Sequence, residues 1–246
     1  SKYGNSIDDI LIALNEKRER ISVLNDYDSY LQKLEQQLAK KEKELAQISD
    51  EVSEIRQGSA VKLVSEIKSA LNDLNFLDVQ FDMHFDRLPD YTANGIDAPE
   101  FLISTNPGEP LKPLGKVASG GELSRIMLGI KTIMAENDHI ESLIFDEIDS
   151  GISGRTAQMV SEKMNELGRN HQIICITHLP QIAAMADAHF LIEKAVENKS
   201  TVSRIRRLTD NDSVAELARM LGGAKITDTV MESAREMKAL AMEKKI

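Results

Sequence analysis

The first quarter of the chain has the hydrophobic spacing of a coiled-coil helix. Hydrophobic residues recur at alternating steps of three and four, which places them along one face of a helix. The other faces carry Glu, Lys and Gln, so the helix needs a partner along a single stripe. The stripe, with Lys41 as its one polar member, comprises Leu24, Tyr27, Leu31, Leu34, Leu38, Lys41, Leu45, Ile48, Val52 and Ile55.

A shorter hydrophobic stripe precedes this seam and is out of phase with it. The change of phase predicts a short upstream helix and a break between about residues 15 and 24. Gly58 and Ser59 then interrupt the seam. We therefore expect residues 1–57 to form a coiled-coil arm and residues 58–246 a globular domain. The upstream stripe comprises Ile7, Leu11, Leu14 and Ile21.

The pattern changes to a period of two after residue 78, which predicts a half-buried strand. Residues Pro89 to Pro99 are predicted to be a loop, and Phe101 to Ser104 a second strand. A helix is expected directly after Gly120 and Gly121, because hydrophobic residues then return at helical spacing. The alternating residues of the first strand are Val79, Phe81, Met83 and Phe85.

The remainder alternates apolar strands with amphipathic helices, which predicts a mostly parallel sheet flanked by helices. In such a sheet, functional groups gather at the carboxyl ends of the strands. The last predicted strand, 202–208, is expected to form a hairpin with the 188–194 strand, and two helices close the chain. The predicted strands are 142–146, 172–177, 188–194 and 202–208, and the predicted helices lie near 154–168, 179–187, 213–221 and 227–243.

Ser119, Gly120 and Gly121 are candidates for an anion-binding turn. Glycines allow the backbone to approach a ligand closely, and the free N–H groups of a following helix attract negative charge. The same residues also fit a capping box, in which Ser119 caps its own helix and Glu122 closes the box three residues later. Both interpretations remain open from these residues alone.

Three candidate chemical groups lie at the predicted strand ends. Asp146 and Glu147 follow the 142–146 strand, and His178 follows the next one. Adjacent carboxylates suit metal-assisted phosphoryl hydrolysis, since one can hold Mg²⁺ while the other activates water. Alternatively, Asp146 and Glu147 cap the following helix, or they join Asp149 and His178 as ligands of an unrelated metal-dependent hydrolase.

Four motifs in order resemble those of the ABC-type ATPases: the signature motif, Walker B, D-loop and switch histidine. The longer phrases are similar to the RecN family of bacterial DNA-repair ATPases, in the SMC-like branch, and the similarity reaches the lead-in that begins Lys2-Tyr3-Gly4. The four motifs are Ser119–Glu122, Asp146–Glu147, Asp149–Gly151 and Thr177–His178. The longer phrases are Ala118–Arg125, Phe145–Gly154, Thr177–Ala183 and Ala218–Gly223.

This resemblance implies an α/β fold, the C-terminal lobe of an ABC-type ATPase head preceded by an antiparallel coiled-coil arm. It implies that Asp146 binds Mg²⁺, that Glu147 polarises the attacking water and that His178 contacts the γ-phosphate. It also implies that the signature motif meets ATP across a homodimer interface and that Asp149 couples the two sites. The implied signature residues are Ser119, Gly120, Gly121 and Glu122.

The Gly-x-x-x-x-Gly-Lys-Ser/Thr phosphate loop that such a site requires does not occur in the sequence. ATP and Mg²⁺ would therefore need an N-terminal half of the same protein that carries the loop, and this chain is expected to be inactive alone. The expected partners are that half, a second copy in an ATP-sandwiched dimer, and DNA. The alternative is a coiled-coil assembly module whose nucleotide motifs are vestigial.

Composition limits the cellular compartment in which the protein acts and the residues that could contact DNA. No apolar run approaches the roughly 18 residues of a membrane helix, so no membrane partner is expected. The resemblance to RecN-like proteins implies a cytoplasmic, nucleoid-associated protein. The single cysteine, Cys175, excludes an intrachain disulfide. A net charge of −10 argues against coating DNA by charge alone. A local DNA contact would use the basic residues Lys194, Lys199, Arg204, Arg206 and Arg207.

Overall fold

The computed structural model describes residues 6–76, 78–117, 119–135, 139–197, 200–223 and 225–245. Lys2 to Gly4, Ala118 and Lys199 lie outside the described residues. The chain divides into two compact units, which we call the arm unit and the head unit. The arm unit comprises Ser1–Gly58 and Arg87–Ala98, and the head unit comprises Ser59–Asp86 and Pro99–Ile246.

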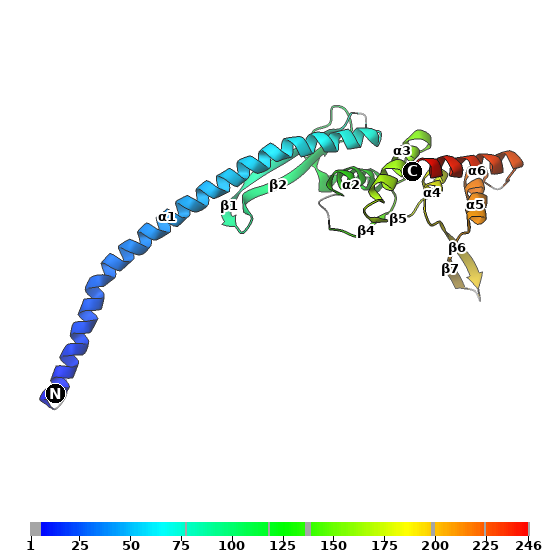
Figure 1. Cartoon of the computed structure of the whole chain (residues 1–246). Helices are drawn as coiled ribbons and strands as arrows, with labels where there is room; N and C mark the ends of the chain where they lie inside the picture. Colours follow the sequence, from blue (N-terminus) through cyan, green and yellow to red (C-terminus); the bar gives the residue numbers. More distant parts are fainter. Residues whose placement is uncertain are drawn as a thin grey trace. The chain divides into compact units, whose positions relative to one another are not determined.

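The arm is one uninterrupted helix, α1, which spans Ile7–Asp73 (Figure 1). The predicted break between residues 15 and 24 is therefore wrong, whereas beyond Gly58 the chain continues as a helix, as expected. Residues 6–57 contain neither Gly nor Pro, so a change of stripe phase does not break the backbone. A single glycine costs a helix only about 1 kcal/mol. The large hydrophobic side chains of the seam, including Leu24, Leu38 and Ile55, are exposed, as expected of a coiled-coil arm.

A β-hairpin contributes its tip to the arm unit. Its strands are β1 (Gln80–Thr92) and β2 (Gly95–Ser104). The predicted loop from Pro89 to Pro99 is therefore wrong, because both strands extend into it. β1 lies at the edge of the β1-β2-β3 sheet, where a proline without an N–H is tolerated. At the turn, the Thr92 hydroxyl donates to the carbonyl of Gly95 (2.8 Å), whose φ of 94° favours glycine.

Polar contacts attach this tip to α1 within the arm unit. The Asp97 carboxylate accepts hydrogen bonds from the Ser53 hydroxyl (2.6 Å) and from Arg56 Nη1 (3.0 Å). Hydrogen bonding by Ser53 and then by Arg56 lowers the pKa of Asp97. Arg87 forms a more exposed ion pair with Asp50 (3.0 Å).

The core of the head unit forms around the end of α1 and helix α2 (Gly120–Met134). Leu71 lies so close to Gly129 of α2 that a Cβ there would stand 3.1 Å from it, so the glycine permits the close approach of the two helices. The predicted alternation in β1 is confirmed, since Phe81 is buried while its neighbours are exposed. The short strand β3 (Lys112–Pro113) and a 3-10 turn (Leu114–Lys116) lead towards α2.

The predicted parallel pairing is confirmed for β4 (Ser142–Phe145) and β5 (Gln172–Cys175). Helix α3 (Gly154–Leu167) connects them. The predicted 188–194 strand does not join this pair. It is β6 (Phe190–Glu197), which instead forms the predicted antiparallel hairpin with β7 (Ser200–Arg207).

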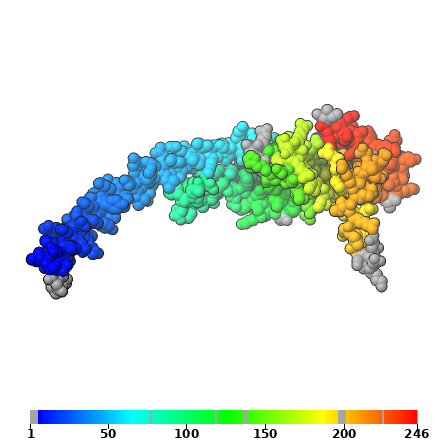
Figure 2. All heavy atoms as spheres, turned by 60° about the horizontal axis from the view of Figure 1, so that its bottom comes forward, coloured from blue at the N-terminus to red at the C-terminus, as the bar shows by residue number. Residues whose placement is uncertain are grey.

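Three helices complete the head unit. They are α4 (Pro180–Ala184), α5 (Asp210–Gly222) and α6 (Asp228–Glu243). Their buried residues form a second cluster that includes Ala183, Leu217 and Ala234. The β6–β7 hairpin, drawn in yellow and gold in Figure 1, projects from the surface next to these helices (Figures 1 and 2).

Candidate functional site

Ser119 is the N-cap of α2. Its hydroxyl oxygen accepts a hydrogen bond from the backbone N–H of Glu122 at 3.4 Å, so half of the capping box is present. This cap is compatible with anion binding. Ser119 and Gly120 are exposed, the first N–H groups of a helix have no intrahelical acceptors, and the Ser119 hydroxyl can still donate its proton.

The loop after β4, residues 146–150, lies against this helix start. Asp146 is exposed, and its Oδ1 accepts the N–H of Glu147 at 2.9 Å. Its other carboxylate oxygen is therefore able to bind a cation such as Mg²⁺, which usually takes one or two protein carboxylates together with water and phosphate oxygens. Glu147 has a φ of 57°, in the left-handed region that non-glycine residues rarely adopt.

The two signature glycines permit this loop to approach closely. A Cβ on Gly120 would stand 2.5 Å from Oε2 of Glu147. A Cβ on Gly121 would stand 2.8 Å from Cβ of Ser150 and 2.9 Å from the carbonyl oxygen of Glu147. Gly121 is buried by these contacts. Packing of α2 on the loop therefore requires a glycine at position 121, whereas at position 120 it restricts only the placement of the Glu147 side chain.

Two further residues of α2 hold the same loop. The Ser124 hydroxyl donates to the carbonyl of Asp146 at 2.8 Å. Arg125 Nη1 donates to the carbonyls of Ile148 (3.2 Å) and Ser150 (2.9 Å). Arg125 is only 7% exposed, and burial lowers its pKa, although an arginine remains charged in proteins. Neither residue was among the predicted site residues.

Asp149 connects this loop to the loop after β5. Its Oδ2 accepts the Thr177 hydroxyl at 2.6 Å and the backbone N–H of His178 at 2.8 Å. The same oxygen lies 3.0 Å from Nδ1 of His178. Asp149 is 4% exposed, whereas the His178 side chain is 73% exposed. The structure thus fixes the His178 backbone and leaves the face of its ring accessible.

The structure brings all eight predicted site residues into one region, but it does not arrange them as a metal cluster. Across the described residues, no group of three or more His, Cys, Asp or Glu side chains could hold a metal ion. The hydrolase alternative, with Asp146, Glu147, Asp149 and His178 as joint ligands, therefore lacks the geometry it requires in these parts of the chain.

The sequence contained a signal for Arg125 but only a weak one for Thr177. Arg125 stands directly before Ile126, among residues that face the core, and an arginine there requires buried acceptors. The role of Thr177 depends on Asp149, which is 28 positions away. Such a contact cannot be derived from helix or strand periodicity.

Cys175 is the last residue of β5, and its thiol is expected to be unreactive. Burial, followed by the negative charges of Asp149 and Asp146, raises the pKa of its thiol to about 12. The thiolate is the reactive form of cysteine. The thiol of the half-buried Cys175 is therefore expected to be a poor nucleophile.

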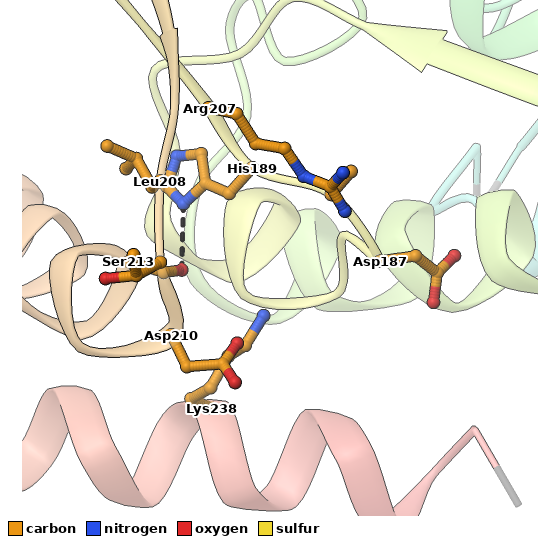
Figure 3. Close-up of a pocket in the computed structure, with 9 residues that line it drawn as sticks. Asp187, His189, Arg207, Leu208, Asp210, Ser213 and Lys238 are labelled. Carbon is orange, nitrogen blue, oxygen red and sulfur yellow. Dashed lines mark hydrogen bonds between the residues drawn. The ribbon is translucent and has the colours of Figure 1, made fainter.

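A cavity of about 310 Å³ lies elsewhere in the head unit, between the base of the β6–β7 hairpin and helices α5 and α6 (Figure 3). His189 Nδ1 and the Ser213 hydroxyl are hydrogen-bonded at 3.0 Å. Lys238 Nζ donates to the carbonyls of Ala184 and Ala186, both at 3.2 Å. Burial lowers the pKa of both His189 and Lys238. These polar groups bond within the fold, and none of the predicted site residues lines the cavity.

The candidate DNA-contacting arginines lie on β7. Arg206 is 3.4 Å from Asp212, and Arg204 is paired across the hairpin with Glu193. Arg207 lines the cavity beside His189. The carboxylates beside Arg204 and Arg206 offset part of their positive charge, so the structure does not present the three arginines as one basic surface.

In the described parts of the chain, every helix is too short or too polar to cross a bilayer. No family model matches the chain. It is 41% identical over 251 residues to "DNA repair protein RecN" of Bacillus subtilis, covering 96% of this chain and 44% of that protein. It is 40% identical over 244 residues to the protein of the same name from Halalkalibacterium halodurans, covering 98% of this chain and 43% of that protein.

The fold has a counterpart among solved structures. The crystal structure of an Smc head domain with a coiled coil and joint from Pyrococcus yayanosii matches with a TM-score of 0.53 and 20% identity. That match covers 86% of this chain and 38% of the solved chain. Similarity at this level shows a shared fold. The chain spans less than half the length of its curated relatives, and over that span it is a homologue of RecN proteins and shares the fold of an SMC head.

Proposed function

We propose that this chain is the C-terminal part of a RecN-type ATPase, and that it supplies half of each ATP-hydrolysis site. One observation carries the proposal. The start of α2, the loop 146–150 and the backbone of His178 form a single hydrogen-bonded assembly at the carboxyl ends of β4 and β5. A capping motif alone would not require a second strand end to be attached to it.

In this proposal, Glu147 acts as the general base towards the attacking water, and His178 donates a hydrogen bond to the γ-phosphate. Mg²⁺, when bound, neutralises charge that develops on the phosphates. Asp146 fits as one of its ligands because it is exposed and has an unengaged carboxylate oxygen. Asp149 holds Thr177 and His178 in place. Ser119, Gly120, Gly121 and Glu122 form the surface that meets ATP bound to a second copy.

Exposed apolar side chains on the two parallel strands support the proposal that a further part of the protein covers them. Ile144 of β4 is 71% exposed, and Ile174 of β5 and the adjacent Ile176 are also exposed. Parallel strands are almost always covered on both faces. We propose that the N-terminal part of the same protein, which would carry the phosphate loop, covers these strands and completes the ATP site.

The wider role follows from the relatives and is a proposal for this chain. We propose that the complete protein forms an ATP-sandwiched homodimer that acts on DNA during double-strand break repair and recombination, in the cytoplasm and associated with the nucleoid. DNA contact by Arg204, Arg206 and Arg207 is a weaker part of the proposal, because carboxylates lie beside two of these residues.

The test uses the full-length protein encoded by the natural gene. Glu147→Gln retains the size of the side chain but cannot accept a proton. Loss of general-base help costs about 10²- to 10⁴-fold in rate. Glu147→Gln should therefore bind ATP normally, hydrolyse it at least about 10²-fold more slowly and accumulate as a dimer. Hydrolysis at the unaltered rate would show that Glu147 is not the base.

Two controls separate the half-site proposal from a vestigial module. Ser119→Arg in the full-length protein should load ATP but fail to dimerise, because it places bulk where the second copy's phosphate would lie. This chain alone should bind ATP weakly and hydrolyse none. Micromolar ATP binding by this chain in calorimetry would contradict the half-site proposal, and a full-length protein that neither binds nor hydrolyses ATP would favour the assembly module.

A further inference from the structure

The backbone of Glu147 is strained and held in place from both sides. Its φ of 57° is in the left-handed region, which is unfavourable for a residue with a side chain. Such a conformation persists only where the surroundings enforce it, and it is most often found at functional sites. The contacts that enforce it identify the residues that position the side chain.

Those contacts come from α2. The carbonyl on the N-terminal side of Glu147, that of Asp146, accepts the Ser124 hydroxyl at 2.8 Å. The carbonyl of Glu147 itself accepts the N–H of Ser150 at 2.9 Å, and the carbonyl of the next residue, Ile148, accepts Arg125 Nη1 at 3.2 Å. The same Nη1 also holds the Ser150 carbonyl at 2.9 Å. Two consecutive residues of one helix therefore hold the loop before and after Glu147, Ser124 through the Asp146 carbonyl and Arg125 through the carbonyls of Ile148 and Ser150.

Arg125 is suited to this task by its own confinement. It is buried, and its guanidinium carbon lies 5.6 Å from the centre of the Phe76 ring, within the range of a cation–π contact. A buried charge without partners is costly, so Arg125 keeps its hydrogen bonds to the two carbonyls. The guanidinium is thus a rigid link between the body of α2 and the loop 146–150.

We propose that Ser124 and Arg125 are positioning residues that couple the signature motif to Glu147 of the same chain. The inference rests on the proposed function and extends it. In the dimer, Ser119 at the start of α2 would meet ATP held by the second copy, whereas Glu147 would act on ATP held by its own copy. A shift of α2 on engagement of one ATP is then passed to the base at the other site.

The kinetic test uses the full-length protein with Arg125→Met, Arg125→Lys and Ser124→Ala. Methionine keeps the length and the apolar contact but cannot donate. Misplacement of a catalytic group by about 1 Å can cost about 10²-fold in rate. We expect Arg125→Met to lower kcat by about 10²-fold, with ATP affinity unchanged. Arg125→Lys should recover part of the rate, because its ammonium can reach a carbonyl, and Ser124→Ala should show a smaller loss.

The conformational test needs no nucleotide and separates this inference from the proposed function. The N–H of Ser150 donates to the Glu147 carbonyl at 2.9 Å and reports on the loop. Amide hydrogen exchange at Ser150 should become faster in Arg125→Met and should be partly restored in Arg125→Lys. Arg155→Met, at an exposed position on α3, is the matched control and should change neither exchange nor kcat.

The combination of Ser150 exchange and kcat decides whether Arg125 couples the signature motif to Glu147. Faster Ser150 exchange together with a fall in kcat at constant ATP affinity supports the coupling. Unchanged exchange at Ser150 in Arg125→Met overturns it, whatever the ATPase activity. Faster exchange with an unaltered kcat also overturns it, because the loop would then move without consequence for Glu147. A wild-type protein without ATPase activity would defeat the proposed function, while the exchange result would still decide whether Arg125 holds the loop.

Discussion

Adding one methyl group to each signature glycine should lower stability more at Gly121 than at Gly120. An alanine Cβ at Gly121 would meet Cβ of Ser150 at 2.8 Å and the Glu147 carbonyl oxygen at 2.9 Å, both part of a buried contact between helix and loop. An alanine Cβ at Gly120 would meet only the end of the exposed Glu147 side chain, at 2.5 Å. The side chain can rotate away, whereas the backbone must shift.

The magnitude follows from this difference. Overpacking a tight contact costs about 1–3 kcal/mol. An alanine in a helix gains up to about 1 kcal/mol over glycine, and this gain applies to both positions, so it cancels in the comparison. For a chain of this size, about 1 kcal/mol corresponds to about 2–4 °C in Tm. Gly121→Ala should therefore melt about 2–12 °C below Gly120→Ala.

The assay is thermal unfolding of the two variants of this chain side by side, followed by circular dichroism. Amide exchange at Ser150 should be faster in Gly121→Ala and unchanged in Gly120→Ala. Melting temperatures that agree within about 1 °C, well below the shift expected from overpacking, would refute the packing argument. In the full-length protein, Gly120→Ala should still slow ATP hydrolysis, because it displaces the Glu147 carboxylate.

Three smaller predictions concern residues around the site and in the arm unit. Because the pKa of its thiol is raised to about 12, Cys175 should react with thiol reagents at pH 8 far more slowly in the folded chain than in denaturant, and equal rates would contradict this. The free energy of unfolding should also fall as pH rises from 9 towards 12, because only the unfolded thiol ionises in that range. Thr177→Val should lower unfolding free energy by about 1–3 kcal/mol by removing a donor to buried Asp149, and Thr177→Ser should restore it. Asp97→Ala should speed amide exchange at Ile96, with Asp50→Ala as the exposed control. Because the pKa of Asp97 is lowered, the wild-type contact should weaken as pH falls below about 4, and an Ile96 protection factor, corrected for the intrinsic exchange rate, that does not change with pH would contradict this.

Local patterns in the sequence predicted most elements of the head unit. The spacing of apolar residues located β4, β5 and the β6–β7 hairpin, because strands and their faces depend on neighbouring residues. The errors arose where a local signal was overridden. The shift of the stripe near residue 15 did not break α1, and Pro89 did not end β1, because an edge strand does not need its N–H.

The site was predictable as a set of residues but not as a network. The order of the motifs identified Ser119, Glu147 and His178 as candidates. The contacts that hold them depend on residues far apart in the chain, such as the bond from Arg125 to Ser150. The left-handed backbone of Glu147 was also beyond prediction, since the same residue in open chain would adopt an ordinary conformation.

The chain passes between the arm unit and the head unit three times: in α1 after Gly58, in β1 after Asp86 and in β2 after Ala98. A fragment that begins at Ser59 would therefore retain the hairpin tip without the part of α1 to which it bonds, leaving the Asp97 carboxylate without its two donors. To isolate the head unit, the hairpin must therefore be shortened together with α1. A protease that cuts α1 alone would leave a head unit whose hairpin tip has lost its hydrogen-bond donors.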